Sequence, residues 1–175
     1  MRELFAIDAK DYKKDWPEIV RPSCRSIIIH GNKVALVHSL LYNYYKFPGG
    51  GIKDGESKEE ALIRETREEA GLNIVPGSIR EYGCVSRRQK AAFPGMDEES
   101  IFVQDNYYYF VRVEEKEDEQ ELDGYENEEH FTLEYVDPLT AIKANLKTDH
   151  GPKDRRMIDR ETRVLSMLVR EGRIR

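Results

Sequence analysis

Residues 50–72 read GGIKDGESKEEALIRETREEAGL and contain the clearest helix signal of the chain. Ser57 is followed by Glu60 three positions later, the pattern of a capping box at the start of a helix. Gly71 stands where a glycine with positive φ commonly ends a helix. The sequence therefore predicts a helix over residues 57–70.

Apolar spacing assigns one side of this helix to the protein core. Leu62, Ile63, Thr66 and Ala70 recur at helical intervals, so we expect them to form a buried stripe. The neighbouring side of the helix is acidic and should point into a cleft.

Three carboxylates on that side, Glu65, Glu68 and Glu69, are spaced i, i+3 and i+4. Like charges at this spacing repel by roughly 0.2–0.5 kcal/mol per pair, and a divalent cation would remove the repulsion. Magnesium prefers such oxygen ligands and pairs naturally with phosphates. The alternative is a solvated acidic face on which Arg64 and Glu68 form an ordinary i, i+4 pair.

The context of the helix favours the metal site over this alternative. The stretch follows the spacing G-x5-E-x7-R-E-U-x-E-E-x-G-U, where U is a bulky apolar residue, and so resembles the Nudix box of the Nudix hydrolases. Thr66 departs from the usual aliphatic residue but keeps a methyl group for packing, and Phe47-Pro48-Gly49 in front is also similar to the family. The matching positions are Gly50, Glu56, Arg64, Glu65, Thr66, Glu68, Glu69, Gly71 and Leu72.

The resemblance implies a site for Mg²⁺, with Mn²⁺ as a substitute. Arg64 would orient a carboxylate through a charge-assisted hydrogen bond. Glu56 would support the metal from its outer shell, and Gly50 and Gly71 would be structural. The residues assigned to the metal are Gly49, through its carbonyl, Glu56, Glu65, Glu68 and Glu69.

The resemblance also implies hydrolysis of a phosphoanhydride bond in a nucleotide. Metal ions neutralise the phosphate oxygens and lower the pKa of bound water, and a carboxylate then takes the proton. Arg64 and Glu65 on the helix are candidate catalytic residues, Glu65 being either the base or a metal ligand. Nudix enzymes often supply another catalytic glutamate from a loop before a late strand. Its candidates here are Glu126, Glu128 and Glu129, and we place Glu65 slightly ahead of any of them as the base.

The rest of the chain predicts an α/β (α+β) fold, a Nudix-like α/β/α sandwich with a mixed β-sheet. We expect one domain over residues 1–175, with 1–20 as an N-terminal extension that is hard to assign and 153–172 as a C-terminal helix. Residues 114–130 are strongly acidic and predict a mostly solvated loop. The other expected elements are strands at 24–30, 33–38, 79–87, 101–114 and 131–136, a loop at 88–100, and a helix from Pro138 to about Ala144.

Composition narrows the partners to small molecules. The net charge of −6 argues against long nucleic acid, and no apolar run has the length of a membrane span. The charged N-terminus lacks a signal peptide's apolar stretch, so we expect a cytoplasmic protein with Cys24 and Cys84 as free thiols. The family is often dimeric, so a homodimer is a further expectation.

Two groups outside the box have open interpretations. Tyr42, Tyr44 and Tyr45 could stack on a nucleobase or simply cover the sheet. Residues 87–89, Arg-Arg-Gln, could hold a distal phosphate, although a surface role is favoured.

The substrate is expected to be a nucleoside diphosphate linked to another group, with a weak preference for a nucleotide sugar such as ADP-ribose. The alternatives are a nucleoside triphosphate pyrophosphohydrolase, an isomerase acting on a diphosphate, and a non-catalytic module that senses a nucleotide. Such modules usually lose box carboxylates, and this box keeps all of them.

Overall fold

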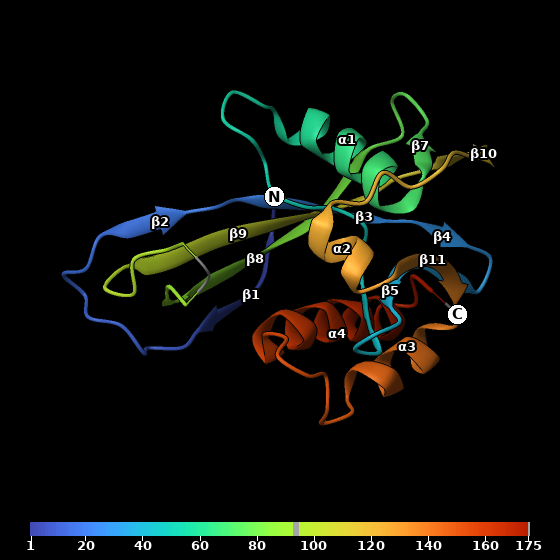
Figure 1. Ribbon diagram of the computed structural model, residues 1–175. Helices are drawn as coiled ribbons and strands as arrows, with labels where there is room; N and C mark the ends of the chain where they lie inside the picture. The colour runs from blue at the N-terminus through green and yellow to red at the C-terminus, as the bar shows by residue number, and fades with distance from the viewer. Residues whose placement is uncertain (93–94, 175) are drawn as a thin grey trace.

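The structure is a computed structural model that describes residues 1–92 and 95–174 of the chain (Figure 1). Helix α1 (Lys58–Ala70) lies on one side of the strands, and α3 (Pro138–Asn145) and α4 (Arg155–Arg170) lie on the other. Parallel and antiparallel pairs both occur among the strands. The predicted α/β/α fold class with mixed strands is therefore confirmed.

The larger sheet has the strand order β1-β8-β9-β2, and β3 also pairs with β9. Strands β8 and β9 are antiparallel to each other, whereas β1, β2 and β3 run parallel to their partners. The long ribbon of β8 and β9 extends away from the helices in Figure 1. The bounds are β1 (Glu3–Asp8), β2 (Glu18–Val20), β3 (Ser23–Ile27), β8 (Arg80–Lys90) and β9 (Ile101–Phe110).

A second, antiparallel sheet has the order β11-β5-β4, with β6 also paired to β5. Gly31 and Asn32 form a tight turn, because His30 and Lys33 face each other across a hairpin. A short antiparallel pair joins β7 to β10. The bounds are β4 (Ile29–His30), β5 (Lys33–Ser39), β6 (Tyr44–Lys46), β7 (Leu72–Ile74), β10 (Val113–Glu117) and β11 (Phe131–Val136).

Several predicted boundaries are wrong. Residues 1–20, which had no assigned element, contain β1 and β2. The single strand expected at 101–114 divides, because Phe110 pairs with the first residue of β8 and the chain then continues beside β7. Strand β8 also runs three residues past the expected end at 87, into the segment predicted as a loop; Pro94 of that segment lies outside the described residues.

The acidic stretch 114–130 is mostly exposed, as predicted, but it is not a continuous loop. It holds β10 and a short helix, α2 (Gly124–Glu128). The Glu126 carboxylate accepts a hydrogen bond from the backbone N–H of Asp123 at 3.0 Å, which stabilises the start of α2. Glu126 and Glu129 are buried rather than exposed to solvent.

Side chains alternate between two apolar layers along the inner strands, as the pleat of a strand requires. Ile27 and Leu36 pack with Val164 and Leu168 of α4, whereas their neighbours Ile28 and Ala35 pack with Leu62 of α1. The structure describes no helix long and apolar enough to cross a membrane.

Both long helices bury residues that the apolar pattern of the sequence does not indicate. On α1, Ile63 is exposed and Ala61 is buried with Leu62, Thr66 and Ala70. On α4, Arg160 and Glu161 are buried beside the apolar residues Ile158, Val164, Leu165 and Leu168, a charged pair that apolar periodicity could not indicate. This pair reaches the site described next.

Candidate active site

Helix α1 begins and ends as its sequence predicts, which fixes the register of its carboxylates. The capping box between Ser57 and Glu60 is present, and Gly71 caps the helix with a φ of 66°. The Glu65 carboxylate lies so close to Gly50 that any Cβ there would collide with it. Glycine at position 50 therefore allows Glu65 to reach the backbone of the loop that precedes the helix.

Arg64 organises the exposed side of this acidic face. Its guanidinium forms a bidentate pair with Glu56 at 2.7 and 2.9 Å, and it also bonds Glu65 at 2.6 Å and Glu68 at 2.9 Å. The hydrogen bonds from Arg64 lower the pKa of Glu56 to about 2. The Arg64 guanidinium thus joins four charged groups in one network.

Glu69 lies deeper, beneath the Gly49-Gly50 loop. One of its oxygens accepts the Gly49 N–H at 2.9 Å, and the other pairs with Lys46 Nζ of β6 at 2.5 Å. Both side chains are buried. The Gly49 carbonyl, in turn, accepts a hydrogen bond from the buried Arg25 of β3.

Glu126 of α2 faces Glu69 from the opposite side. Burial and the negative charge of Glu69 raise the pKa of Glu126 to about 7. Tyr125 donates a hydrogen bond to Glu126 at 3.1 Å. Burial also raises the pKa of Glu65, assisted by the charge of Glu69. Glu65, Glu69, Glu126 and the Gly49-Gly50 backbone are called the acidic site from here on.

The other two loop candidates lie elsewhere. Glu129 is held by Ser39 at 2.9 Å, by Tyr44 at 2.8 Å and by an ion pair with Lys153. Glu128 is exposed at the edge of a neighbouring pocket. Of the three candidates, Glu126 is the one that meets the carboxylates of α1.

The residues of the acidic site fit a divalent cation by their chemistry, since carboxylate and carbonyl oxygens are the ligands that Mg²⁺ prefers. Burial and the charge of Glu69 raise the pKa of Glu65 and Glu126, and a cation beside these carboxylates would favour their charged form. Over residues 1–92 and 95–174, no three His, Cys, Asp or Glu side chains already stand in a ligating arrangement. Instead, Lys46 pairs with Glu69, and Arg64 pairs with Glu65 and Glu68.

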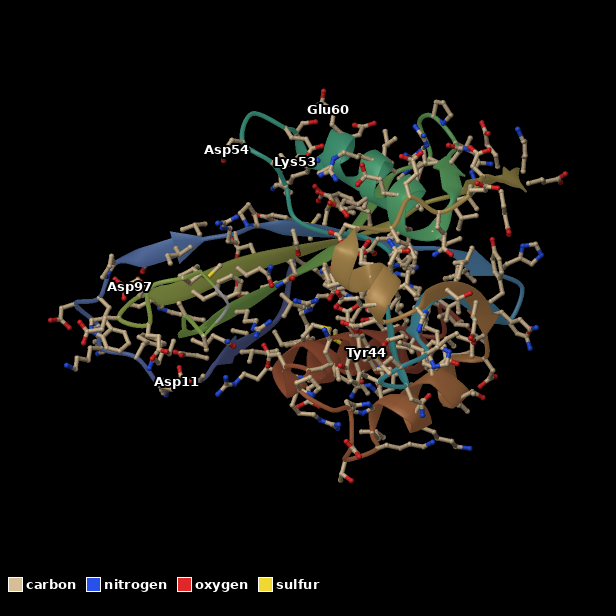
Figure 2. All side chains as sticks on the ribbon, in the orientation of Figure 1. Asp11, Tyr44, Lys53, Asp54, Glu60 and Asp97 are labelled. Atoms are coloured by element: carbon tan, nitrogen blue, oxygen red, sulfur yellow. The ribbon has the colours of Figure 1, made fainter. Side chains whose placement is uncertain are left out.

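Glu56 and Glu68 line a groove of about 670 Å³ on the outer side of α1. Figure 2 shows Lys53 and Asp54 on the loop beside the N-terminal end of this helix, while Tyr44 lies far below it, at the level of α4. The candidate ligands are therefore divided, with Glu56 and Glu68 on the outer side of α1 and Glu69 turned toward α2.

The pocket beside α2 has a volume of about 760 Å³ and lies between the ribbon of β8 and β9, α2 and the N-terminal end of α4. Tyr42, Phe102 and Tyr125 supply aromatic surface. We call it the basic pocket, and its basic side chains are Arg25, Arg87, Lys153, Arg156 and Arg160.

The surface role favoured for residues 87–89 is wrong for two of them. Arg87 and Gln89 are buried and line the basic pocket, whereas Arg88 points outward to Glu18. Alternation along β8 explains the difference, because Arg87 and Gln89 share a face with the buried Val85. Tyr44 and Tyr45 are buried and cover the sheet, which leaves Tyr42 at the pocket.

Sequence reasoning overlooked Arg25 and Lys46. Each is a single Arg or Lys within a mainly apolar or aromatic run of strand residues, CRSIIIH and YYKF. Buried charges are rare unless paired or functional, so such an interruption is itself a signal. The sequence does not show which group pairs with such a charge, because the partners are brought together only by the fold.

The fold and the acidic site together define a class: an α/β/α sandwich in which a capped, glutamate-rich helix lies against a glycine loop. Residues 20–160 match the NUDIX domain, and the chain belongs to that family.

Solved structures agree with this fold. A nudix hydrolase family member from Chromobacterium violaceum matches with a TM-score of 0.51 at 21% identity, over 87% of this chain and 78% of that one. A MutT structure from work on Aliivibrio salmonicida and Vibrio cholerae matches with a TM-score of 0.53 at 15% identity, over 87% and 99% of the two chains.

Curated relatives are similar over shorter stretches. An RNA pyrophosphohydrolase of Alkalilimnicola ehrlichii is 31% identical over 54% of this chain and 54% of its own length. An 8-oxo-dGTP diphosphatase of Proteus vulgaris is 40% identical over 21% of this chain and 33% of its own. The chain thus spans about half or less of the length of these relatives.

Proposed function

We propose that the protein hydrolyses a phosphoanhydride bond in a nucleotide, a nucleoside diphosphate linked to another group. The observation that carries this proposal is the convergence of Glu65, Glu69 and Glu126 at the Gly49-Gly50 loop, beside a pocket rich in arginine. Acidic oxygens suit a cation that binds phosphate, and the arginines suit the phosphates themselves.

Gly49, Glu56, Glu65, Glu68 and Glu69 would hold the divalent ion, Mg²⁺ or Mn²⁺. When bound, the ion neutralises phosphate oxygens and lowers the pKa of a bound water. Arg64 holds Glu65 and Glu68 in place, and its bidentate bond to Glu56 fixes the guanidinium itself. The protein supplies no covalent nucleophile in this proposal.

Proton transfer from the attacking water falls to a carboxylate that is buried and near the α1 ligands. Glu65 and Glu126 both satisfy this condition, and a pKa raised toward neutrality suits a general base. Glu129 is less suited, because Ser39, Tyr44 and Lys153 already use its oxygens.

The similar proteins support anhydride chemistry, since two of them are a pyrophosphohydrolase and a diphosphatase. Their names concern RNA and 8-oxo-dGTP, whereas the sequence weakly favours a nucleotide sugar such as ADP-ribose. Nucleoside triphosphates are therefore the second candidate class. A non-catalytic sensing module would bind these compounds without turnover.

A hydrolysis screen tests the proposal. Nucleotide sugars, dinucleoside polyphosphates and nucleoside triphosphates are incubated with magnesium, with manganese and with EDTA, and the released phosphate products are measured. We expect turnover of at least one class with metal and none with EDTA. Absence of turnover in all three classes with both metals would refute hydrolysis.

A further inference from the structure

The basic pocket is connected to the acidic site but is chemically its opposite. Arg25 lines the pocket and bonds the Gly49 carbonyl, and Tyr125 lines it and bonds Glu126. A substrate with its cleaved anhydride at the acidic site would place its remaining part here. The volume of about 760 Å³ falls within the range of small-molecule pockets, roughly 300–1,000 Å³.

The pocket carries a positive excess in an acidic protein. Among the described lining residues, five basic side chains stand against three carboxylates, while the whole chain has a net charge of −6. Asp154 pairs with Arg87 and Glu129 pairs with Lys153, which leaves Arg25, Arg156 and Arg160 against Glu128 among the lining residues. Outside the lining, Arg156 pairs with the exposed Asp11 and Arg160 with the buried Glu161. The excess is local and points to an anionic ligand.

Burial strengthens the interactions of these positive charges. Arg87 and Arg160 are 4% and 1% exposed, and a buried guanidinium is expensive unless it is well paired. Burial, together with the charges of Arg160 and Arg156, lowers the pKa of Arg87 to about 9. Arg25 is also buried, and its Nε has no hydrogen-bond partner.

The buried arginines are nevertheless held in fixed positions. Gln89 accepts two bonds from Arg87, at 2.8 and 2.9 Å, and Arg160 bonds Asn106 at 2.6 Å and Glu161 at 2.8 Å. Guanidinium groups positioned in advance recognise phosphate well, because little ordering is needed on binding. A purely structural role would explain the hydrogen bonds and ion pairs of these arginines. It would not require that the arginines line a cavity.

We propose that the basic pocket binds a substrate phosphate additional to the two that share the cleaved anhydride, with Arg87 and Arg156 selecting for it. This inference rests on the proposed function. It favours triphosphates and dinucleoside polyphosphates over ADP-ribose, whose two phosphates both belong to the cleaved bond.

Diadenosine diphosphate and diadenosine triphosphate provide a matched pair of substrates that differ by one phosphate. The wild-type kcat/KM should favour the triphosphate about tenfold or more, and Arg87→Gln or Arg156→Gln should reduce that preference about tenfold. Arg80→Gln, on the same strand but exposed at its far end, is the control and should keep the preference. Equal kcat/KM values in the wild type, or an unaltered preference in both pocket variants, would overturn the proposal.

Binding of inorganic tripolyphosphate in EDTA, measured by calorimetry, separates this inference from hydrolysis. The wild type and Arg80→Gln should bind the probe, and both pocket variants should bind it at least tenfold more weakly. Arg156→Gln keeps the test valid if Arg87→Gln fails to fold, because Arg156 is exposed. Binding without turnover would refute the proposed function but support the pocket, whereas turnover with no tripolyphosphate binding would refute the pocket.

Discussion

The acidic site and the basic pocket lie side by side, but they are encoded in opposite ways. Most of the acidic site comes from residues 49–69, where helical spacing alone brings carboxylates together. The basic pocket draws its arginines from β3, β8 and α4, which are far apart in the chain. The comparison indicates that the chemistry is readable from one motif, while substrate choice depends on the tertiary fold.

The largest effect should come from Glu69→Gln. Glu69 contacts both the Gly49 N–H and Lys46, and it is a proposed ligand, so we expect turnover to fall on the order of a thousandfold. Binding of metal to the folded state should raise the melting temperature of the wild type, and the variant should show a smaller rise. Initial rates and melting curves at millimolar magnesium or manganese check both. A full metal-induced rise in the variant would remove Glu69 from the ligand set.

Glutamine substitutions at Glu65, Glu126, Glu128 and Glu129 decide which group is the base. Loss of the base should lower the maximal rate roughly a hundredfold with metal affinity little changed. We expect that result for Glu126 or Glu65, the two glutamates of the acidic site other than Glu69. Glu128→Gln should lie within about twofold of wild type, because this residue is exposed. If Glu129→Gln alone shows the hundredfold loss, the base lies at the boundary with the basic pocket.

Glu129→Ala should lower stability more than it lowers catalysis. It removes the acceptor of two buried hydroxyls, those of Ser39 and Tyr44, and we expect a loss of about 2 kcal/mol in the free energy of unfolding. Glu129→Gln keeps an acceptor and is the matched control. Urea denaturation measures both variants, and equal stability of the two would contradict a structural role for the Glu129 carboxylate.

Thr66→Val should have the smallest effect. The Thr66 hydroxyl bonds Ser26 and the Leu62 carbonyl, both at 2.6 Å, and so joins α1 to the strand that carries Arg25. Removing it leaves a buried Ser26 hydroxyl short of a partner, and we expect a loss of about 1 kcal/mol, which is a shift of about 2–4 °C in melting temperature. An increase in melting temperature would show that the usual aliphatic residue suits this position better.

Sequence predicted α1, its caps and the fold class because each depends on local spacing and a strong motif. It misplaced Ile63 because a helix stripe has edges that only packing defines. It could not show which residues of the mostly exposed stretch 114–130 are buried, because the group that faces Glu126 is Glu69, fifty-seven positions away in the chain. Strand alternation alone could have predicted the burial of Arg87, because Arg87 lies two positions after the buried Val85 on the same face of β8. Its neighbours on α4 could not be predicted in this way.

Isotope labelling tests the central claim most directly, that the acidic site directs water to phosphorus. The best substrate of the screen is hydrolysed by the wild-type protein with magnesium in oxygen-18 water, and the products are analysed by mass spectrometry. We expect one oxygen-18 atom in a phosphate-containing product. Label found only on a sugar carbon would contradict the account.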